Sequence, residues 1–113
     1  MPKKTLDPLP SAAFHILLAL AGGDLHGYAI MREVESQTDG RVRLGPGTLY
    51  SSLQSLLDAG AIYEVGNKAA SGERRRHYRL SAAGKKLVRS ETERLEELLK
   101  IARAKKFTEG KYA

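Results

Sequence analysis

Hydrophobic positions recur with a helical period through the first half of the chain. Apolar residues are spaced three or four apart in residues 11–22, 26–37 and 45–60, which predicts three short helices. Paired glycines follow the first segment, the turn sequence TDG follows the second, and Gly60 closes the third. Each predicted helix therefore has a stop signal of its own.

The period changes in the second half. Residues 61–65 (AIYEV) and 77–80 (HYRL) are short and rich in β-branched and aromatic residues, which is typical of strands. Between them lies the glycine-rich, basic segment 66–76, so the pattern predicts a hairpin with a mobile basic tip. Residues 81–107 return to helical spacing and predict one long helix, followed by a frayed tail at 108–113. The predicted fold class is mainly α with a small β-hairpin.

The third predicted helix has two contrasting faces. Pro46 suits its first position, because the N–H that proline lacks would be unpaired there, and Gly60 suits a left-handed end. One face carries leucines, at Leu49, Leu53, Leu56 and Leu57. The other carries uncharged polar groups, at Tyr50, Ser51 and Gln54. Such a helix can pack on a core with one side and offer polar groups outward with the other.

Three helices followed by a hairpin are the order of a winged helix-turn-helix, in which one helix enters the major groove of DNA. Gln54 can pair with adenine and Ser51 with bases or phosphates, whereas Tyr50 is either a DNA contact or a half-buried packing aromatic. Thr48, near the helix start, can meet a phosphate beside backbone N–H groups. Further phosphate contacts are expected from basic residues before this helix and in the hairpin, at Arg41, Arg43, Lys68, Arg74, Arg75 and Arg76. The alternative for the arginine run is a solvated loop.

The charge distribution favours a polyanion as partner. The chain has 113 residues and a formal net charge of +6. Residues 1–60 hold five Lys or Arg against six Asp or Glu, whereas residues 61–113 hold fourteen against seven. The basic excess therefore lies in the second half, which suggests nucleic acid or an acidic membrane, or else a merely solvated surface. The apolar run at 14–21 is too short to span a bilayer, and no membrane partner is expected.

Enzymatic chemistry is not indicated. The chain has no cysteine, which excludes disulfides and thiolate sites and fits a cytoplasmic protein. Its three histidines lack the spacing of metal ligands. Gly45 and Gly47 begin a dinucleotide-binding pattern, but Tyr50 stands where the third glycine belongs. We therefore expect no catalytic residues, no metal and no cofactor.

Two apolar surfaces are predicted to need a cover from outside the chain. The helix at 11–22 is apolar on nearly all sides, and the helix at 81–107 has a narrow apolar stripe that no remaining segment can cover. A second copy would bury both, which predicts a homodimer. The expected interface residues are Phe14, Leu17, Leu20, Val88, Leu95, Leu98, Leu99 and Ala102. The alternatives are a helix 11–22 central to a monomer, and a long helix whose first half folds back onto 11–22; the second is compatible with a dimer.

Three segments resemble the PadR-like transcriptional regulators: LHGYAIMREVE at 25–35, GRVRLGPGTLYSSLQSLLDAGAI at 40–62 and ERRRHYRLSAAGKKL at 73–87. The likeness covers about residues 12–100, with Ser51 where the family usually has proline. It implies a homodimeric winged-helix repressor of the short type, whose first and last helices form the dimer and whose third helices each meet one half of an inverted repeat. The predicted organisation is a DNA-binding domain at 1–80, whose first helix also joins the dimer, and a dimerisation helix at 81–107.

Some short members of this family hold flat aromatic effectors in the dimer interface, stacked on tryptophan, and this chain has no tryptophan. A hydrophobic small-molecule effector would enter between the first and last helices, near Phe14 or Leu95. The sequence thus favours a dimeric, sequence-specific repressor on double-stranded operator DNA. The alternative is a winged-helix module that binds protein or RNA without reading DNA sequence.

Overall fold

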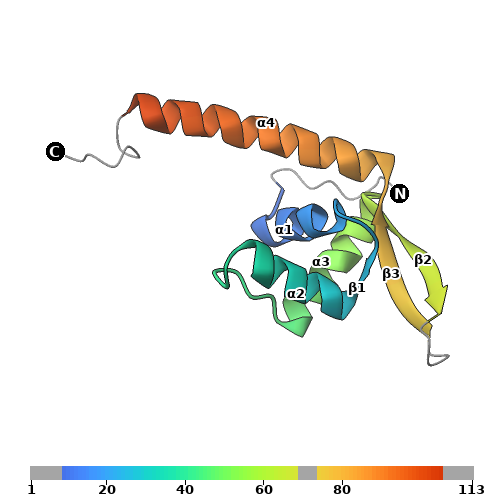
Figure 1. Ribbon diagram of the computed structural model, residues 1–113. Helices are drawn as coiled ribbons and strands as arrows, with labels where there is room; N and C mark the ends of the chain where they lie inside the picture. Colours follow the sequence, from blue (N-terminus) through green and yellow to red (C-terminus); the bar gives the residue numbers. More distant parts are fainter. Residues whose placement is uncertain (1–8, 69–73, 106–113) are drawn as a thin grey trace.

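The computed structural model describes residues 9–68 and 74–105 of the chain (Figure 1). In these residues the chain forms four helices and three strands, and the fold is mainly helical with a small sheet, as predicted. The elements are α1 (Ser11–Leu20), β1 (Leu25–His26), α2 (Gly27–Gln37), α3 (Pro46–Asp58), β2 (Ile62–Lys68), β3 (Arg74–Leu80) and α4 (Ala82–Ala104). The centre of the hairpin tip that was predicted to be mobile and the tail predicted to fray lie outside the described residues.

The three strands form one antiparallel sheet in the order β1-β3-β2. β2 and β3 pair from Ile62 with Leu80 to Lys68 with Arg74, so the hairpin is longer than its apolar residues indicated. The added pairs contain no apolar residue larger than glycine, so hydrophobic spacing could not mark them as strand. β1 pairs with β3 over two residues, too few to leave a pattern in the sequence.

The core lies between α1, α2, α3 and the near end of the hairpin, and these elements cover most of α1. Leu18 is the one large aliphatic residue of α1 that is exposed, at 36%. Leu17 and Leu20, predicted to face a second chain, are 0% and 3% exposed. The prediction needs correction for these two leucines, because their own chain already buries them. The core residues with the least exposure are Ile16, Leu17, Ile30, Val34, Leu49, Leu53 and Leu56.

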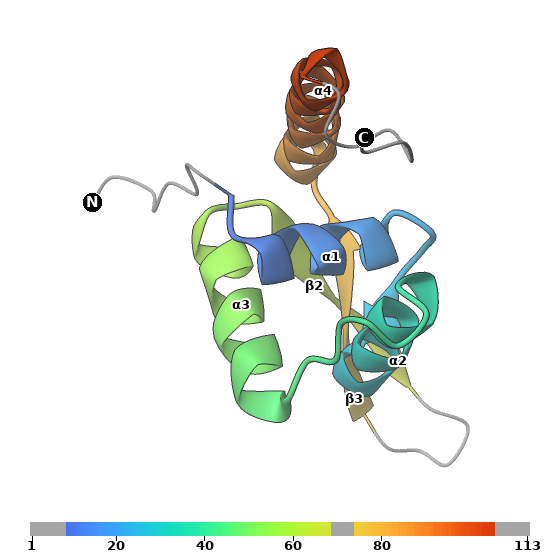
Figure 2. The ribbon, with the colours of Figure 1, turned by 90° about the vertical axis from the view of Figure 1, so that its left-hand side faces the viewer.

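α4 lies across α1, on the side of the body away from the far end of the hairpin (Figures 1 and 2). Ser81 caps the helix as its position suggested, accepting a hydrogen bond from the Gly84 N–H at 3.0 Å. The first half of α4 packs on the core through Leu87 and Val88, so this half does fold back onto its own chain. The second half carries apolar side chains that are 41–48% exposed, at Leu95, Leu98, Leu99 and Ile101.

Candidate nucleic-acid interface

α3 separates its apolar and polar residues as the sequence predicted. Its buried side carries Leu49, Leu53 and Leu56, and its exposed side carries Thr48, Tyr50, Ser51 and Gln54. Pro46 occupies the first helical position, and the N-cap is Gly45, which has no side chain to bond the N–H groups of that turn. The start of α3 therefore offers uncharged polar side chains together with backbone N–H groups that lack a side-chain cap.

Gln54 already has a partner within α3. Its Nε2 donates a hydrogen bond to the Asp58 carboxylate at 2.9 Å, one turn further along the helix. Both side chains are exposed, so water competes for this bond and its net contribution is small. The Gln54 amide has two N–H donors, so a base can bond the second one or replace Asp58, an internal partner that the sequence pattern did not reveal.

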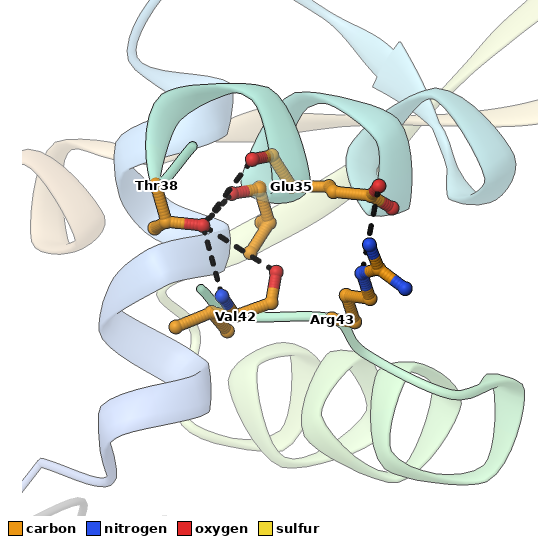
Figure 3. Close-up of polar contacts among 5 residues, drawn as sticks. Glu35, Thr38, Val42 and Arg43 are labelled. Carbon is orange, nitrogen blue, oxygen red and sulfur yellow. Dashed lines mark hydrogen bonds and ion pairs between the residues drawn. The ribbon is translucent and has the colours of Figure 1, made fainter. Parts of the chain in front are cut away.

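The connection that positions α3 is held by one hydroxyl (Figure 3). Thr38, at the end of α2, donates to the Val34 carbonyl at 2.8 Å and accepts from the Val42 N–H at 3.0 Å. The chain reverses between these residues through Asp39 and Gly40, which have φ of 52° and 77°. Thr38 thereby links both ends of the turn. The TDG sequence predicted only that the helix stops here, and not this bridging role.

Tyr50 leans from α3 onto the first residue of α2. A Cβ placed on Gly27 would lie 2.8 Å from the Tyr50 hydroxyl oxygen, so a larger residue there would move the tip of the Tyr50 side chain. The Tyr50 side of the helix is still open to solvent, since the residue is 54% exposed. Tyr50 is therefore a packing residue at its tip and an exposed residue along its length, and its contact with DNA stays a prediction.

A cleft of about 410 Å³ opens beside Tyr50, between α3, the start of α2 and β3. It is lined by His26, Gly27, Tyr28, Tyr50, Arg76 and Tyr78. The six described lining residues thus supply phenol hydroxyls, an imidazole and a guanidinium, and none of the six is acidic. Burial raises the pKa of the Tyr78 phenol, so this hydroxyl keeps its proton and remains a donor at neutral pH. Such donors suit an anion.

His26 lines this cleft and is also the N-cap of α2. Its Nδ1 accepts a hydrogen bond from the Ala29 N–H at 3.2 Å and so caps α2. The ring also meets His77, its cross-strand neighbour, edge to face at 5.4 Å between ring centroids. Sequence reasoning found neither His26 nor Tyr28, although both stand in the HGY segment that carried the family resemblance.

The basic residues predicted to contact phosphates are exposed where their side chains are described. Arg41 is exposed, Arg43 faces Glu35 at 3.6 Å, and Arg76 faces Glu64 at 3.5 Å. Exposed pairs of this length contribute at most about 1 kcal/mol, so the two arginines can exchange their partners for phosphate. Among the predicted hairpin residues, the backbone pairs Lys68 with Arg74, and Arg75 follows in β3.

Arg79 has a structural role instead. It holds Asp24, in the loop after α1, through two hydrogen bonds of 2.9 Å and 2.7 Å. The hydrogen bond from Arg79 keeps the pKa of the Asp24 carboxyl below its ordinary value. This pair links the base of the hairpin to the loop after α1. Arg79 belongs to the basic half of the chain, but its guanidinium is already paired within the fold.

A groove of about 560 Å³ lies on the other side of the molecule, between the end of α1 and the first half of α4. Its apolar floor includes Leu80 and Val88, and its rim carries charged side chains of α4. The groove occurs where an effector was predicted to enter, between the first and last helices. Phe14 and Leu95, the two residues named for that site, are not among its lining residues.

The described residues contain neither a cluster of metal ligands nor a helix that could span a membrane. Within 9–68 and 74–105, no three His, Asp or Glu side chains gather closely enough to hold a metal ion. None of the helices described combines the length and apolar character needed to cross a bilayer.

Comparison with known proteins identifies the family. The model of the transcriptional regulator PadR-like family matches residues 16–90, which is most of the winged helix-turn-helix and the first part of α4. The chain belongs to the PadR-like family. The PadR-like proteins are transcriptional regulators and not, in general, enzymes. The resemblance seen in the sequence is thereby confirmed.

Three relatives show how far the likeness extends. A transcriptional regulator from Clostridium thermocellum is 29% identical, with a TM-score of 0.72 over 86% of this chain and 92% of that one. Bacillus subtilis PadR, solved in complex with operator DNA, is 22% identical, with a TM-score of 0.64 over 72% of this chain and 46% of that one. A 37.1 kDa protein of a Streptomyces fradiae transposon is 41% identical over 76 residues, which are 67% of this chain. The match spans only 20% of that protein.

Proposed function

We propose that this PadR-like protein is a homodimeric, sequence-specific DNA-binding repressor that occupies an inverted-repeat operator. The observation that carries the proposal is the exposed face of α3, whose side chains from Thr48 to Gln54 are polar and uncharged and adjoin a cleft lined by hydrogen-bond donors. The proposed organisation assigns residues 1–80 to DNA binding and 81–107 to dimerisation. Bacillus subtilis PadR, which shares the fold and was solved with operator DNA, supports this assignment.

Base readout is assigned to the exposed face of α3. Gln54 has the amide geometry that pairs with adenine, its Oε1 accepting and its Nε2 donating, either through the second N–H or in place of the bond to Asp58. Ser51 stands one turn earlier on the exposed side, and Thr48 stands at the helix start beside backbone N–H groups. Because α3 has no Lys or Arg, its contribution is to sequence preference more than to electrostatic affinity.

Phosphate contacts are assigned to the basic residues that flank α3. Arg41 and Arg43 precede the helix, and the hairpin supplies Lys68, Arg74, Arg75 and Arg76. We assign a backbone phosphate to the cleft beside Tyr50, where Arg76 provides the charge and Tyr28 a hydroxyl. These contacts would position α3 in the groove and carry most of the salt-dependent affinity.

The dimer contact is assigned to the exposed apolar stripe of α4. Leu95, Leu98 and Leu99 stay 41–46% exposed in the single chain, and Ala102 continues the stripe one turn on. Phe14 and Val88 are half-buried and can adjoin it, whereas Leu17 and Leu20 belong to the core. Two copies joined in this way would carry two α3 helices, one for each half-site, and repression would follow from occlusion of RNA polymerase.

A hydrophobic effector is assigned to the groove between α1 and α4. Its volume of about 560 Å³ is within the range of small-molecule sites, and it adjoins the stripe assigned to the dimer. An effector there would change DNA affinity only if it binds the free and DNA-bound dimers with different strength.

The test is a selection of duplexes from a random pool by the purified protein. We expect an inverted repeat, bound by two chains. Gln54→Ala should lose about 1–3 kcal/mol of discrimination at one base pair per half-site while keeping its salt dependence. Arg76→Ala should weaken binding to all duplexes alike and reduce the salt slope by about 1. Arg103→Ala, the same change in the last turn of α4, is the control and should alter neither.

The contrary result is a selection that enriches no sequence, with equal and steeply salt-dependent binding to every duplex. That result would contradict base readout by α3. The chain would then be a winged-helix module with a basic surface, and RNA or protein partners would have to be sought.

A further inference from the structure

Ser81 joins two elements that are far apart in the sequence. It immediately precedes α4, and its side-chain hydroxyl donates to the carbonyl of Gly60, just after α3, at 2.6 Å. The same oxygen accepts from the Gly84 N–H in the first turn of α4 at 3.0 Å. The Ser81 N–H donates to the Ala61 carbonyl at 3.0 Å. The end of α3 and the start of α4 therefore share one hydroxyl and a backbone bond, with the whole hairpin between them in sequence.

Both sides of this junction are held by short backbone contacts. On the α3 side, Gly60 has a φ of 75°, and the N–H of Ala61 bonds back to the Leu56 carbonyl at 2.9 Å, so Gly60 and Ala61 extend the helix end. On the α4 side, Gly84 is buried against Ala61, and a Cβ at Gly84 would overlap the Ala61 carbonyl oxygen. The first turn of α4 thus lies directly on the residues that end α3.

The directions of the two helices mean that a small change of angle at this junction displaces the far end of α4 relative to α3. In Figure 2 the end of α3 points toward the side of the body that carries α4, and its start points away from it. α4 has 23 residues, which at about 1.5 Å per residue span roughly 35 Å. A tilt of about 10° at the junction would move its far end by roughly 6 Å, more than the rise of about 3.4 Å per base pair.

We propose that Ser81 is a positioning residue that fixes α3 relative to α4, and so sets the separation of half-sites that the dimer accepts. This inference rests on the proposed function, since it needs a dimer formed through α4 and two half-sites. The hydroxyl holds the angle between the reading helix and the dimer helix, and the Ser81→Gly60 hydrogen bond is the part of the junction that a side chain controls.

Three variants separate this bond from helix capping. Ser81→Asp keeps a good N-cap acceptor for the Gly84 N–H but has no proton to donate to the Gly60 carbonyl. Ser81→Thr keeps both the acceptor and the donor and is the rescue control. Ser81→Ala removes both, and provides a second test should the aspartate variant fold poorly.

The assay uses the inverted repeat that wild-type protein selects from a random pool, and versions of it with one or two base pairs added or removed between the half-sites. Wild type and Ser81→Thr should lose at least tenfold in affinity for each one-base-pair change. Ser81→Asp and Ser81→Ala should lose less than threefold, while they bind an isolated half-site as wild type does. Circular dichroism and sedimentation should show their helix content and dimer mass unchanged.

Two results would overturn the inference, and they differ. If Ser81→Asp and Ser81→Ala keep the spacing penalty of wild type, the dimer stands but Ser81 does not set its geometry. If wild type itself binds every spacing with equal affinity, the proposed dimer on two half-sites is wrong, and the inference about Ser81 is wrong with it. A merely structural role for Ser81 would lower affinity for all spacings by the same factor.

Discussion

Gly84→Ala is expected to destabilise the protein strongly, although alanine is the better helix former. Gly84 lies in the first turn of α4 and is buried against the end of α3. An added Cβ would overlap the Ala61 carbonyl oxygen, and would lie 3.1 Å from the Ala61 carbonyl carbon and 3.3 Å from Leu80 Cδ2. The closest of these atoms belong to the backbone, so no side-chain rotation can relieve the overlap.

The size of the effect follows from what must move. If α4 shifts away from Ala61, the 3.0 Å hydrogen bond from the Ser81 N–H is lost or lengthened, which costs about 1–3 kcal/mol where the partners are shielded from water. The repacking of the neighbouring core adds about 1–3 kcal/mol. The higher helix propensity of alanine returns about 1 kcal/mol. The net loss in the free energy of unfolding is therefore about 1–5 kcal/mol, with a central value near 3 kcal/mol.

Urea denaturation followed by circular dichroism measures this loss, at one fixed protein concentration because dimer formation adds to stability. Gly47→Ala is the matched control. Gly47 is also in the first turn of a helix, but nothing lies within 4 Å of the Cβ it would gain. Its variant should be unchanged or up to about 1 kcal/mol more stable. Equal midpoints for Gly84→Ala and wild type would refute the close contact between α4 and the end of α3.

Three further predictions concern the turn, the hairpin base and the dimer. Thr38→Val should lower the free energy of unfolding by about 1–2 kcal/mol in urea titrations, because the Val42 N–H loses its acceptor. The control, Thr92→Val, removes an exposed hydroxyl that is bonded within α4 and should cost less than about 0.5 kcal/mol. Because the pKa of Asp24 is lowered in the folded protein, the stability that its ion pair with Arg79 contributes is fully present above the unfolded pKa near 3.8. That stability is lost as the pH falls through the folded pKa. Acid titration should therefore unfold wild type more steeply in that range than Asp24→Asn, and parallel curves would count against this ion pair. Leu98→Glu should weaken dimerisation about a hundredfold or more in sedimentation experiments, and Ser90→Glu, off the apolar stripe, should leave it unchanged.

The parts of the fold that the sequence predicted well are those with local signals. Pro46 and Gly60 bracket α3 as expected, because a proline at the first helical position and a glycine in a left-handed conformation act through their own backbone. Ser81 caps α4 for the same kind of reason. The polar face of α3 follows from helical periodicity once the leucines are buried.

The parts that could not be predicted depend on residues distant in sequence. The cleft beside Tyr50 forms because β3 brings Arg76 and Tyr78 against the start of α2, and no spacing in the chain encodes that meeting. The apolar residues around α1 predict a surface for a second chain. In the fold, α2, α3, α4 and β3 all pack on α1, and Leu17 and Leu20 are buried within their own chain.

The measurement that tests the central claim most directly is a titration of the protein into its selected inverted repeat and into a scrambled duplex of equal length, at two salt concentrations. The account predicts a preference of about a thousandfold or more for the repeat, with two chains bound per duplex and a preference that Gln54→Ala reduces. Equal affinity for both duplexes at each salt concentration would contradict it, because the exposed face of α3 would then read no sequence.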